Sequence, residues 1–383
     1  MLFNGISSAD RPAPDQIEVS VFGNGFGEAI LIHLGNEKWL SVDSFRLGTG
    51  NEVTTESQPI ALAYLKHIGV DPENAIKVLC ASHWDTDHID GISEVLRACP
   101  KALFVGSTAL TREEFVAYVK AIESRPLTQL STREREVGQI QDALVSRTCP
   151  GFNKFALVDR EVFYSPSAEQ IHGCDVRIRT LSPTDDQLAQ FLVNIGNQIP
   201  EVRATKRHSQ EFRPNLISVV LRVEIGNAVI LLGADMEDTG NPTHGWTAIL
   251  SSISAADGKK AAIFKIPHHG SQNGHNDHVW SKMLVSNPIA LVTAFTRLRE
   301  PLPTDRDRAR ITKLTSDAYI ASEVSPSKST KSLDRRVRNE VRAMGARIVR
   351  ANPKEGFIRA RSVGGLNSLN WSIDLFGTAK SLA

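Results

Sequence analysis

The chain has 383 residues, of which 41% are hydrophobic and 23% charged, a balance typical of a globular protein and not of a disordered or low-complexity chain. No window approaches 18 consecutive apolar residues, and the first residues lack the order of a secretory signal, so we expect no membrane span and a cytoplasmic protein. The four cysteines lie far apart without a CxxC pair, which favours free thiols over disulfides.

The net charge of +1 hides an uneven distribution. Residues 297–361 hold 17 Lys or Arg and 8 Asp or Glu, a net of +9, so the remainder carries about −8. A basic segment beside a less basic body is what binding to a phosphate-rich partner requires, although a solvated helical face has the same composition. Within this segment "SLDRRVRNEVRAMG" predicts a basic helix, with Ser332 as its N-cap and Gly345 at its end.

The first half of the chain predicts strands followed by alternating helices and strands. "IEVSVFGNGFGEAILIHLGNEKWLSVD" favours two or three antiparallel strands that end at Asp43, and "SQPIALAYLKHIGVD" favours a helix. A buried strand "AIKVLCAS", a helix "GISEVLRACP" and a strand "KALFVGS" then form a βαβ unit. The stretch "HWDTDH" follows the first of these strands, where ligands gather in α/β layers. Residues 111–147 look helical and polar, as expected of a lid, an insertion or a partner surface.

The second half predicts further strand ends that carry polar side chains. "CDVRIRTLSP" reads as a strand and "DDQLAQFLVNIGNQ" as a helix. A hairpin across Gly226-Asn227 delivers Asp235 at a strand end, and "AAIFKIPHHG" places His268 and His269 just after another strand. "ARIVRANPKEGFIRARS" predicts a closing hairpin. No linker interrupts these elements, so we expect residues 1–383 to form one layered α/β domain.

Three separated strand ends thus carry His or Asp clusters, and strand ends in a layered fold converge. Imidazole and carboxylate together suit zinc, manganese or iron. A two-metal centre needs ligands on each side and a carboxylate between the ions. The spacing lets His83 and Asp85 face one ion and Asp87 and His88 face the other, with Asp235 as the bridge.

At this point a family resemblance is apparent. "HWDTDH" resembles the HxHxDH metal motif of the metallo-β-lactamase fold, with Asp85 where the second histidine stands. This HxDxDH form is similar to the nuclease-like domain of ComEC-type competence proteins, as are, in the same order, the opening Gly-rich strand pair, "NLISVVLRVEIGNAVILLGADME", "FKIPHHGSQNG" and the closing hairpin. The resemblance covers about residues 17–361. It implies a four-layer αββα sandwich.

The resemblance also implies a metal-dependent hydrolase, most simply a phosphodiesterase or nuclease that uses two divalent ions, Zn or Mn, and a metal-bound hydroxide. The candidate metal ligands are His83, Asp85, Asp87, His88, Asp235 and His268. The candidate catalytic residues are Asp85, Asp87 and His269. The candidate substrate-binding residues are Asn215, Ser218 and Ser271, joined by four arginines of the basic segment that would contact phosphates: Arg335, Arg336, Arg338 and Arg342.

Two departures from the pattern qualify this interpretation. The opening loop "GNGFGE" is longer than the usual Gly-x-Gly turn, which would reshape one wall of the cleft. The subgroup lacks the third-motif histidine of the wider fold, and His172 and His208 are expected at structural positions. A hydrolase of a small ester, lactone or amide stays open as an alternative, as does a non-catalytic binding protein with a vestigial site. The oligomeric state and the choice between nucleic acid and nucleotide also stay open.

Overall fold

The structure is a computed structural model, and it describes residues 2–47, 57–124, 126, 128, 130–147, 153–167, 173–203, 214–324 and 355–382. The predicted basic helix lies outside the described residues, and so does the first arm of the closing hairpin. The candidate residues that also lie outside them are Arg335, Arg336, Arg338, Arg342, His172 and His208.

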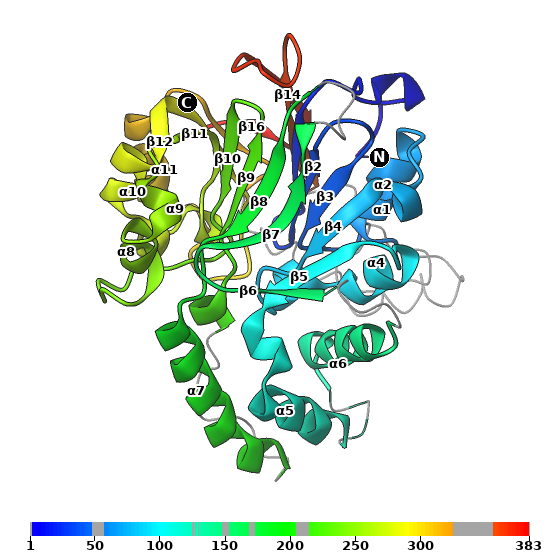
Figure 1. Ribbon diagram of the computed structural model, residues 1–383, viewed down its shortest axis with the longest axis vertical. Coiled ribbons are helices and arrows are strands. Elements are labelled where there is room, and N and C mark those ends of the chain that lie inside the picture. The colour runs from blue at the N-terminus through cyan, green and yellow to red at the C-terminus, as the bar shows by residue number, and fades with distance from the viewer. Residues whose placement is uncertain are drawn as a thin grey trace, which may run out of the picture.

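The described strands form two eight-stranded sheets (Figure 1). The first sheet has the order β15-β14-β1-β2-β3-β4-β5-β6, and the second has the order β16-β13-β12-β11-β10-β9-β8-β7. The strands of the first sheet are β1 (Glu18–Gly23), β2 (Glu28–His33), β3 (Trp39–Val42), β4 (Ile76–Cys80), β5 (Leu103–Ser107), β6 (Asn153–Ala156), β14 (Gly356–Ser362) and β15 (Trp371–Gly377). Those of the second are β7 (Arg160–Ser165), β8 (Val176–Thr180), β9 (Leu221–Ile225), β10 (Ala228–Leu232), β11 (Ala261–Lys265), β12 (Leu284–Val292), β13 (Ala318–Ile320) and β16 (Lys380–Ser381).

The pairing confirms the strands that the sequence predicted around the site. β1, β2 and β3 pair antiparallel, and β3, β4 and β5 pair parallel. β9 and β10 form the predicted hairpin across Gly226-Asn227, where Gly226 adopts a φ of +56° that favours glycine. The central strands are buried along their whole length, as expected of sheets covered on both faces.

The described α-helices lie between these strands in the chain. They are α1 (Ile60–His67), α2 (Pro72–Ala75), α3 (Thr86–Ile89), α4 (Ile92–Ala98), α5 (Glu113–Glu123), α6 (Thr132–Val145), α7 (Asp185–Arg203), α8 (Gly245–Leu250), α9 (Ile253–Ala256), α10 (Asp277–Lys282) and α11 (Asp305–Leu314). Within the described ranges, none is both long enough and apolar enough to cross a bilayer.

Alternate side chains of the strands enter different hydrophobic clusters. In β4, Val78 joins a cluster built from both sheets, whereas Leu79 joins a second cluster with apolar residues of α1, α4, α5, α6 and α7. In β10, Ile230 belongs to the cluster between the sheets, and Leu231 to a third cluster with α8, α10 and α11. This period of two follows from the strand geometry. The protein is therefore a mixed α/β structure with two large sheets, consistent with the expected αββα sandwich.

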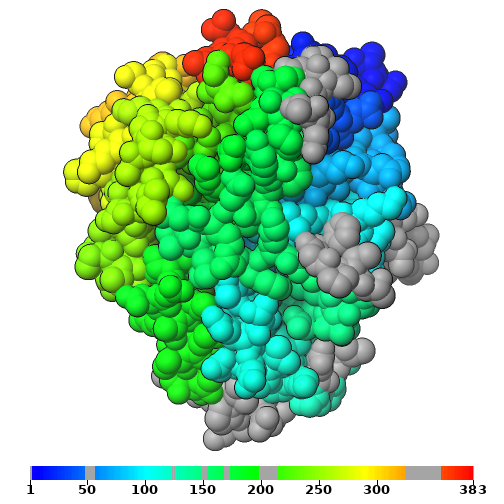
Figure 2. Space-filling view, viewed as in Figure 1, coloured from blue at the N-terminus to red at the C-terminus, as the bar shows by residue number. Residues whose placement is uncertain are grey.

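The region 111–147 contains helices, as predicted. Ser131 begins α6 with a capping box to Glu134, and α5 packs its Phe115 ring against Trp84 with 4.7 Å between the ring centroids. In the ribbon view α5, α6 and α7 lie together below the sheets (Figure 1). In the space-filling view the part of the chain from β6 to α7, coloured green, fills the middle of this face. It reaches the lower end of the face beside α5, which is coloured cyan (Figure 2). These helices therefore cover the loop that carries "HWDTDH".

Candidate metal centre

The candidate site lies where strands of both sheets end. Asp43 follows β3, the "HWDTDH" stretch follows β4, and these two strands run parallel. Asp235 follows β10, and His269 follows β11, its parallel neighbour. Parallel strands bring their carboxyl ends to one edge, which explains why polar residues far apart in the sequence meet here.

The loops at these strand ends hold several non-glycine residues in the left-handed region. The φ angles are +58° at Asp43, +47° at Ala234, +48° at His268 and +52° at His269. Each such residue costs on the order of 1–3 kcal/mol and persists only when its surroundings enforce it. Backbone strain of this kind is typical of active sites and ligand-binding sites, where side chains must converge.

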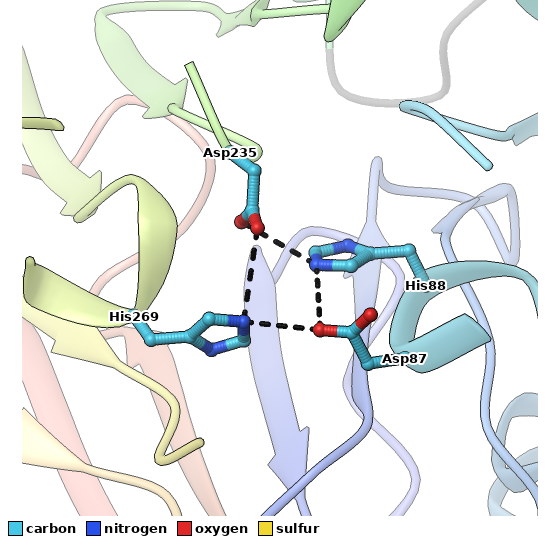
Figure 3. Close-up of side chains that lie close together, drawn as sticks. All are labelled: Asp87, His88, Asp235 and His269. Atoms are coloured by element: carbon cyan, nitrogen blue, oxygen red, sulfur yellow. Dashed lines mark hydrogen bonds and ion pairs between the residues drawn. The ribbon is translucent and has the colours of Figure 1, made fainter. Parts of the chain in front are cut away.

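Four side chains form a closed ring in which carboxylates and imidazoles alternate (Figure 3). The Nε2 atom of His88 lies 3.6 Å from Asp87 Oδ2 and 3.4 Å from Asp235 Oδ1. The Nε2 atom of His269 lies 3.2 Å from Asp87 Oδ2 and 3.8 Å from Asp235 Oδ2. One ligand atom from each residue lies within 4.8 Å of every other, and all four residues are buried. The ring has the size and the donor types of a metal-binding site.

Neighbouring residues fix which ring nitrogen of each histidine faces the centre. His88 donates from Nδ1 to Asp43 Oδ2 at 2.7 Å, which directs its Nε2 atom inward. The Thr293 hydroxyl must donate to the carboxylate of Glu28, 2.5 Å away, so it accepts from Nδ1 of His269 at 3.1 Å. Both Nε2 atoms therefore face the ring. Outer contacts of this type orient histidine ligands in metal centres.

The electrostatics of the ring favour positive charge at its centre. Both Nε2 atoms face carboxylate oxygens, and His88 Nε2 and Asp235 Oδ1 are buried without a hydrogen-bond partner. Burial opposes charge on His88, but the carboxylates of Asp235, Asp87 and Asp43 outweigh it and raise the pKa of His88 well above its ordinary value. Burial likewise opposes charge on Asp235, yet the His88 and His269 rings hold its pKa well below the usual range. The ring therefore attracts positive charge, and a divalent ion fits this donor set.

His83 and Asp85 lie beside the ring and share Asp235 with it. His83 Nε2 is buried without a hydrogen-bond partner, 3.9 Å from Asp235 Oδ2 and 3.8 Å from Asp85 Oδ2. Its Nδ1 lies 3.0 Å from the Ser82 hydroxyl, which donates to Asp43 and so accepts from the imidazole. Burial, followed by the nearby His88, lowers the pKa of His83, so this ring is neutral with an inward lone pair. Asp235 thus lies between His83 on one side and the ring histidines on the other, and its role as a bridging ligand stays a prediction.

Three other candidate residues are not members of the ring. His268 turns away from the ring, with its Nδ1 3.6 Å from Glu237 Oε1, so the ring contains His269 and not its neighbour. Asn215 donates to the same Glu237 oxygen at 3.2 Å. Ser218 is buried and accepts a bond from Ser182 through its carbonyl oxygen. The roles predicted for these residues stay predictions.

Ser271 lies one turn beyond the ring histidine. Its backbone N–H donates to the carbonyl of His268, and it lines a small cavity near Trp246 and Trp280 on the helix-covered side of the second sheet. Its predicted contact with substrate also stays a prediction.

A buried network behind His269 was not predicted from the sequence. Lys265 Nζ lies 2.6 Å from Glu28 Oε2, and both side chains are almost fully buried. The same Glu28 oxygen accepts from Thr293, which holds His269. A signal for this network is present in "AAIFKIP", because a lysine inside an apolar strand requires a buried partner.

The sequence analysis also missed Arg133 of α6. Its Nη1 donates to Asp85 Oδ1 at 3.0 Å, while the other Asp85 oxygen faces His83. The helical region therefore contributes a guanidinium to the edge of the candidate centre. The sequence offered no signal for this contact, since nothing in "STREREV" distinguishes this arginine from its neighbours.

Fold and site together define a mixed α/β protein with a buried His/Asp cluster suited to a divalent metal ion. No family model matches the chain, and no curated protein matches it. Among solved structures it is similar to the metallo-beta-lactamase fold protein YhfI from Bacillus subtilis, with 14% sequence identity over 82% of this chain and 98% of that chain and a TM-score of 0.38. At that level of likeness, the function has to be argued from this chain's own site.

Proposed function

We propose that this protein is a metal-dependent hydrolase of phosphodiesters, a nuclease or phosphodiesterase built on a metallo-β-lactamase-like αββα sandwich. The observation that carries the proposal is the ring of Asp87, His88, Asp235 and His269, whose inward Nε2 atoms and carboxylates could hold a divalent cation. Hydrolysis is the chemistry that such a centre supports without a further cofactor.

The residues divide into two ligand groups. Asp87, His88 and His269 would hold one ion, His83 and Asp85 a second, and Asp235 would serve both. The mixed nitrogen and oxygen donors suit zinc or manganese. Bound there, divalent ions would supply Lewis acidity and make water a nucleophile near neutral pH.

The protein's own residues prepare this centre. Asp43 fixes His88 and reaches His83 through Ser82, so a single carboxylate orients both histidines of the "HWDTDH" stretch. Thr293 does the same for His269. With its ligands held in place before substrate binds, the centre needs little reorganisation during the reaction.

The choice of a phosphodiester rests on three further observations. The order of sequence motifs resembles the ComEC-type nuclease-like domain, and residues 297–361 carry a net charge of +9. Arg133, held beside the centre by Asp85, adds a guanidinium where an anionic substrate would approach. A neutral ester or lactone offers no charge for these groups to bind.

Cleavage of labelled single- and double-stranded DNA and RNA tests the proposal. Wild type and Asp87→Asn would be assayed with Mn²⁺, Zn²⁺ or Mg²⁺, beside Asp305→Asn, which makes the same exchange on the exposed first turn of α11. We expect cleavage that depends on added metal, disappears in Asp87→Asn and persists in the control. If no nucleic acid or small phosphodiester is cut with any metal while a lactone or ester is hydrolysed, the phosphodiester assignment is wrong.

A further inference from the structure

A line of rings leads outward from the candidate centre to an exposed arginine. The ring centroid of His269 lies 5.1 Å from that of Phe295, and the Phe295 centroid lies 5.4 Å from that of Phe26. The guanidinium carbon of Arg297 lies 3.3 Å from the Phe26 centroid, in a cation–π arrangement. Phe26 and Phe295 are partly buried, and Arg297 is exposed. The line therefore begins at a candidate ligand and ends in solvent.

Hydrogen bonds and a close contact hold the loop at residues 24–27, which carries Phe26, in one conformation. The Asn24 side chain accepts from the backbone N–H of Phe26 at 3.0 Å and from that of Gly27 at 2.7 Å. A Cβ on Gly27 would lie 2.5 Å from the Cβ of Phe45, so only glycine permits this close approach. This is the "GNGFGE" loop, whose extra length the sequence analysis expected to reshape one wall of the cleft.

The loop that carries Arg297 is tied to the first one. Thr296 donates from its backbone N–H and from its hydroxyl to the carbonyl of Gly25, at 2.8 and 2.6 Å. These bonds place the guanidinium over Phe26 without relying on the flexible arginine side chain alone. The two loops therefore form one wall beside the centre.

The guanidinium of Arg297 is not paired with a neighbouring carboxylate within the described residues. Within the described part of the chain Arg297 forms no salt bridge, and the nearby Asp90 pairs with Arg46 at 3.3 Å. Burial lowers the pKa of Arg297, and the more distant carboxylates Asp87 and Asp90 oppose that shift. Asp87 belongs to the ring, so the guanidinium lies within electrostatic reach of the centre and retains hydrogen-bond donors for a ligand.

We propose that Phe26 and Arg297 form a subsite for a phosphate group that flanks the scissile phosphodiester of a single-stranded nucleic acid. The ring of Phe26 supports the guanidinium plane, and the outward N–H groups bind the flanking phosphate. This inference rests on the proposed function and extends it, because a flanking phosphate is present in an oligonucleotide and absent from a diester with one phosphorus atom.

Binding of a fluorescein-labelled single-stranded oligonucleotide, followed by fluorescence anisotropy without metal at several salt concentrations, tests the subsite. Arg297→Gln would be compared with Arg299→Gln, an exposed arginine of the same loop. Losing one charge-assisted contact should weaken binding about ten-fold, and losing one phosphate contact should reduce the slope of log K against log salt by roughly 0.7. Phe26→Leu should weaken binding and Phe26→Tyr should preserve it, because tyrosine keeps the ring beneath the guanidinium.

The outcomes separate this inference from the function on which it rests. Equal losses in Arg297→Gln and Arg299→Gln, or no oligonucleotide binding by wild type, would overturn the subsite. Cleavage of nucleic acid that is indifferent to Arg297 would overturn the subsite and leave the proposed function standing. Binding that depends on Arg297, from a protein that cuts no nucleic acid with any metal, would support the subsite as an anion-binding site and refute the nuclease.

Discussion

The buried ion pair behind His269 gives the sharpest prediction for stability. Lys265 and Glu28 are 0% and 1% exposed, and their charged atoms lie 2.6 Å apart. Lys265→Met preserves the shape of the side chain but leaves Glu28 buried without its cation. Removing one partner of a buried pair costs about 3–5 kcal/mol, because the remaining charge loses its compensation. We expect a loss of this size in the free energy of unfolding.

Urea unfolding of Lys265→Met, Glu28→Gln and the double variant measures this loss. The double variant should lose less than Lys265→Met alone, because no charge is left buried and the introduced amide keeps an oxygen for the Thr293 hydroxyl. A loss below about 1 kcal/mol in Lys265→Met, where the pair should matter most, would refute the argument. A double variant whose loss equals the sum of the single losses would refute it as well.

The pH dependence of the same pair has a definite sign. Burial raises the pKa of Glu28, but the positive charges of Lys265, His88 and His269 together outweigh burial and lower the pKa below the ordinary value of 4.5. The pair's stabilisation is therefore fully present above pH 4.5 and is lost as the pH falls through the lower folded-state pKa. The difference in stability between wild type and Glu28→Gln should shrink only in that acidic range.

Three further predictions concern other parts of the molecule. Asp43→Asn should weaken the binding of Mn²⁺ or Zn²⁺ about 10- to 100-fold, because His88 loses its orienting carboxylate. Calorimetric titration measures this affinity, and an unchanged affinity would mean that His88 is not a ligand. Burial lowers the pKa of His33 to about 4, against the ordinary 6.5, so its neutral form stabilises the fold above pH 6.5 and that contribution is lost as the pH falls toward 4. The loss should reach about 3 kcal/mol, and it should be missing in His33→Gln when unfolding is measured across this range. Phe115→Ala should cost about 3–5 kcal/mol in urea unfolding, because its ring stacks on Trp84 and is 1% exposed; a loss under 1 kcal/mol would show that α5 contributes little to covering the site.

Much of the site was predictable because its residues follow strands with strong local patterns. The apolar run before His83 and the hairpin before Asp235 each define a strand end. Convergence of strand ends then brings Asp87, His88 and Asp235 together without knowledge of the full topology. The strands β6, β7, β12, β13, β15 and β16 were not predicted. None of them is buried along its whole length, and their patterns are correspondingly weak.

The remainder depends on contacts that no local pattern encodes. His268 and His269 are adjacent and share positive φ angles, and the backbone rotation alone decides that His269 enters the ring. Thr293 comes 24 residues after His269 and follows a different strand. Such contacts follow from how the two sheets are placed against each other, which a single sequence does not show.

The pairing of β14 with β1 has a consequence for how the chain folds during synthesis. Arg361 in β14 bonds Glu18 in β1 across a separation of 343 residues, and the last strand, β16, pairs in the other sheet. One edge of β1 therefore stays unpaired during synthesis until the residues of β14 have emerged from the ribosome. An open strand edge is a template for intermolecular pairing, and long-range pairing folds slowly. The nascent chain thus keeps this edge exposed to intermolecular pairing even after every residue of the candidate metal centre has been made.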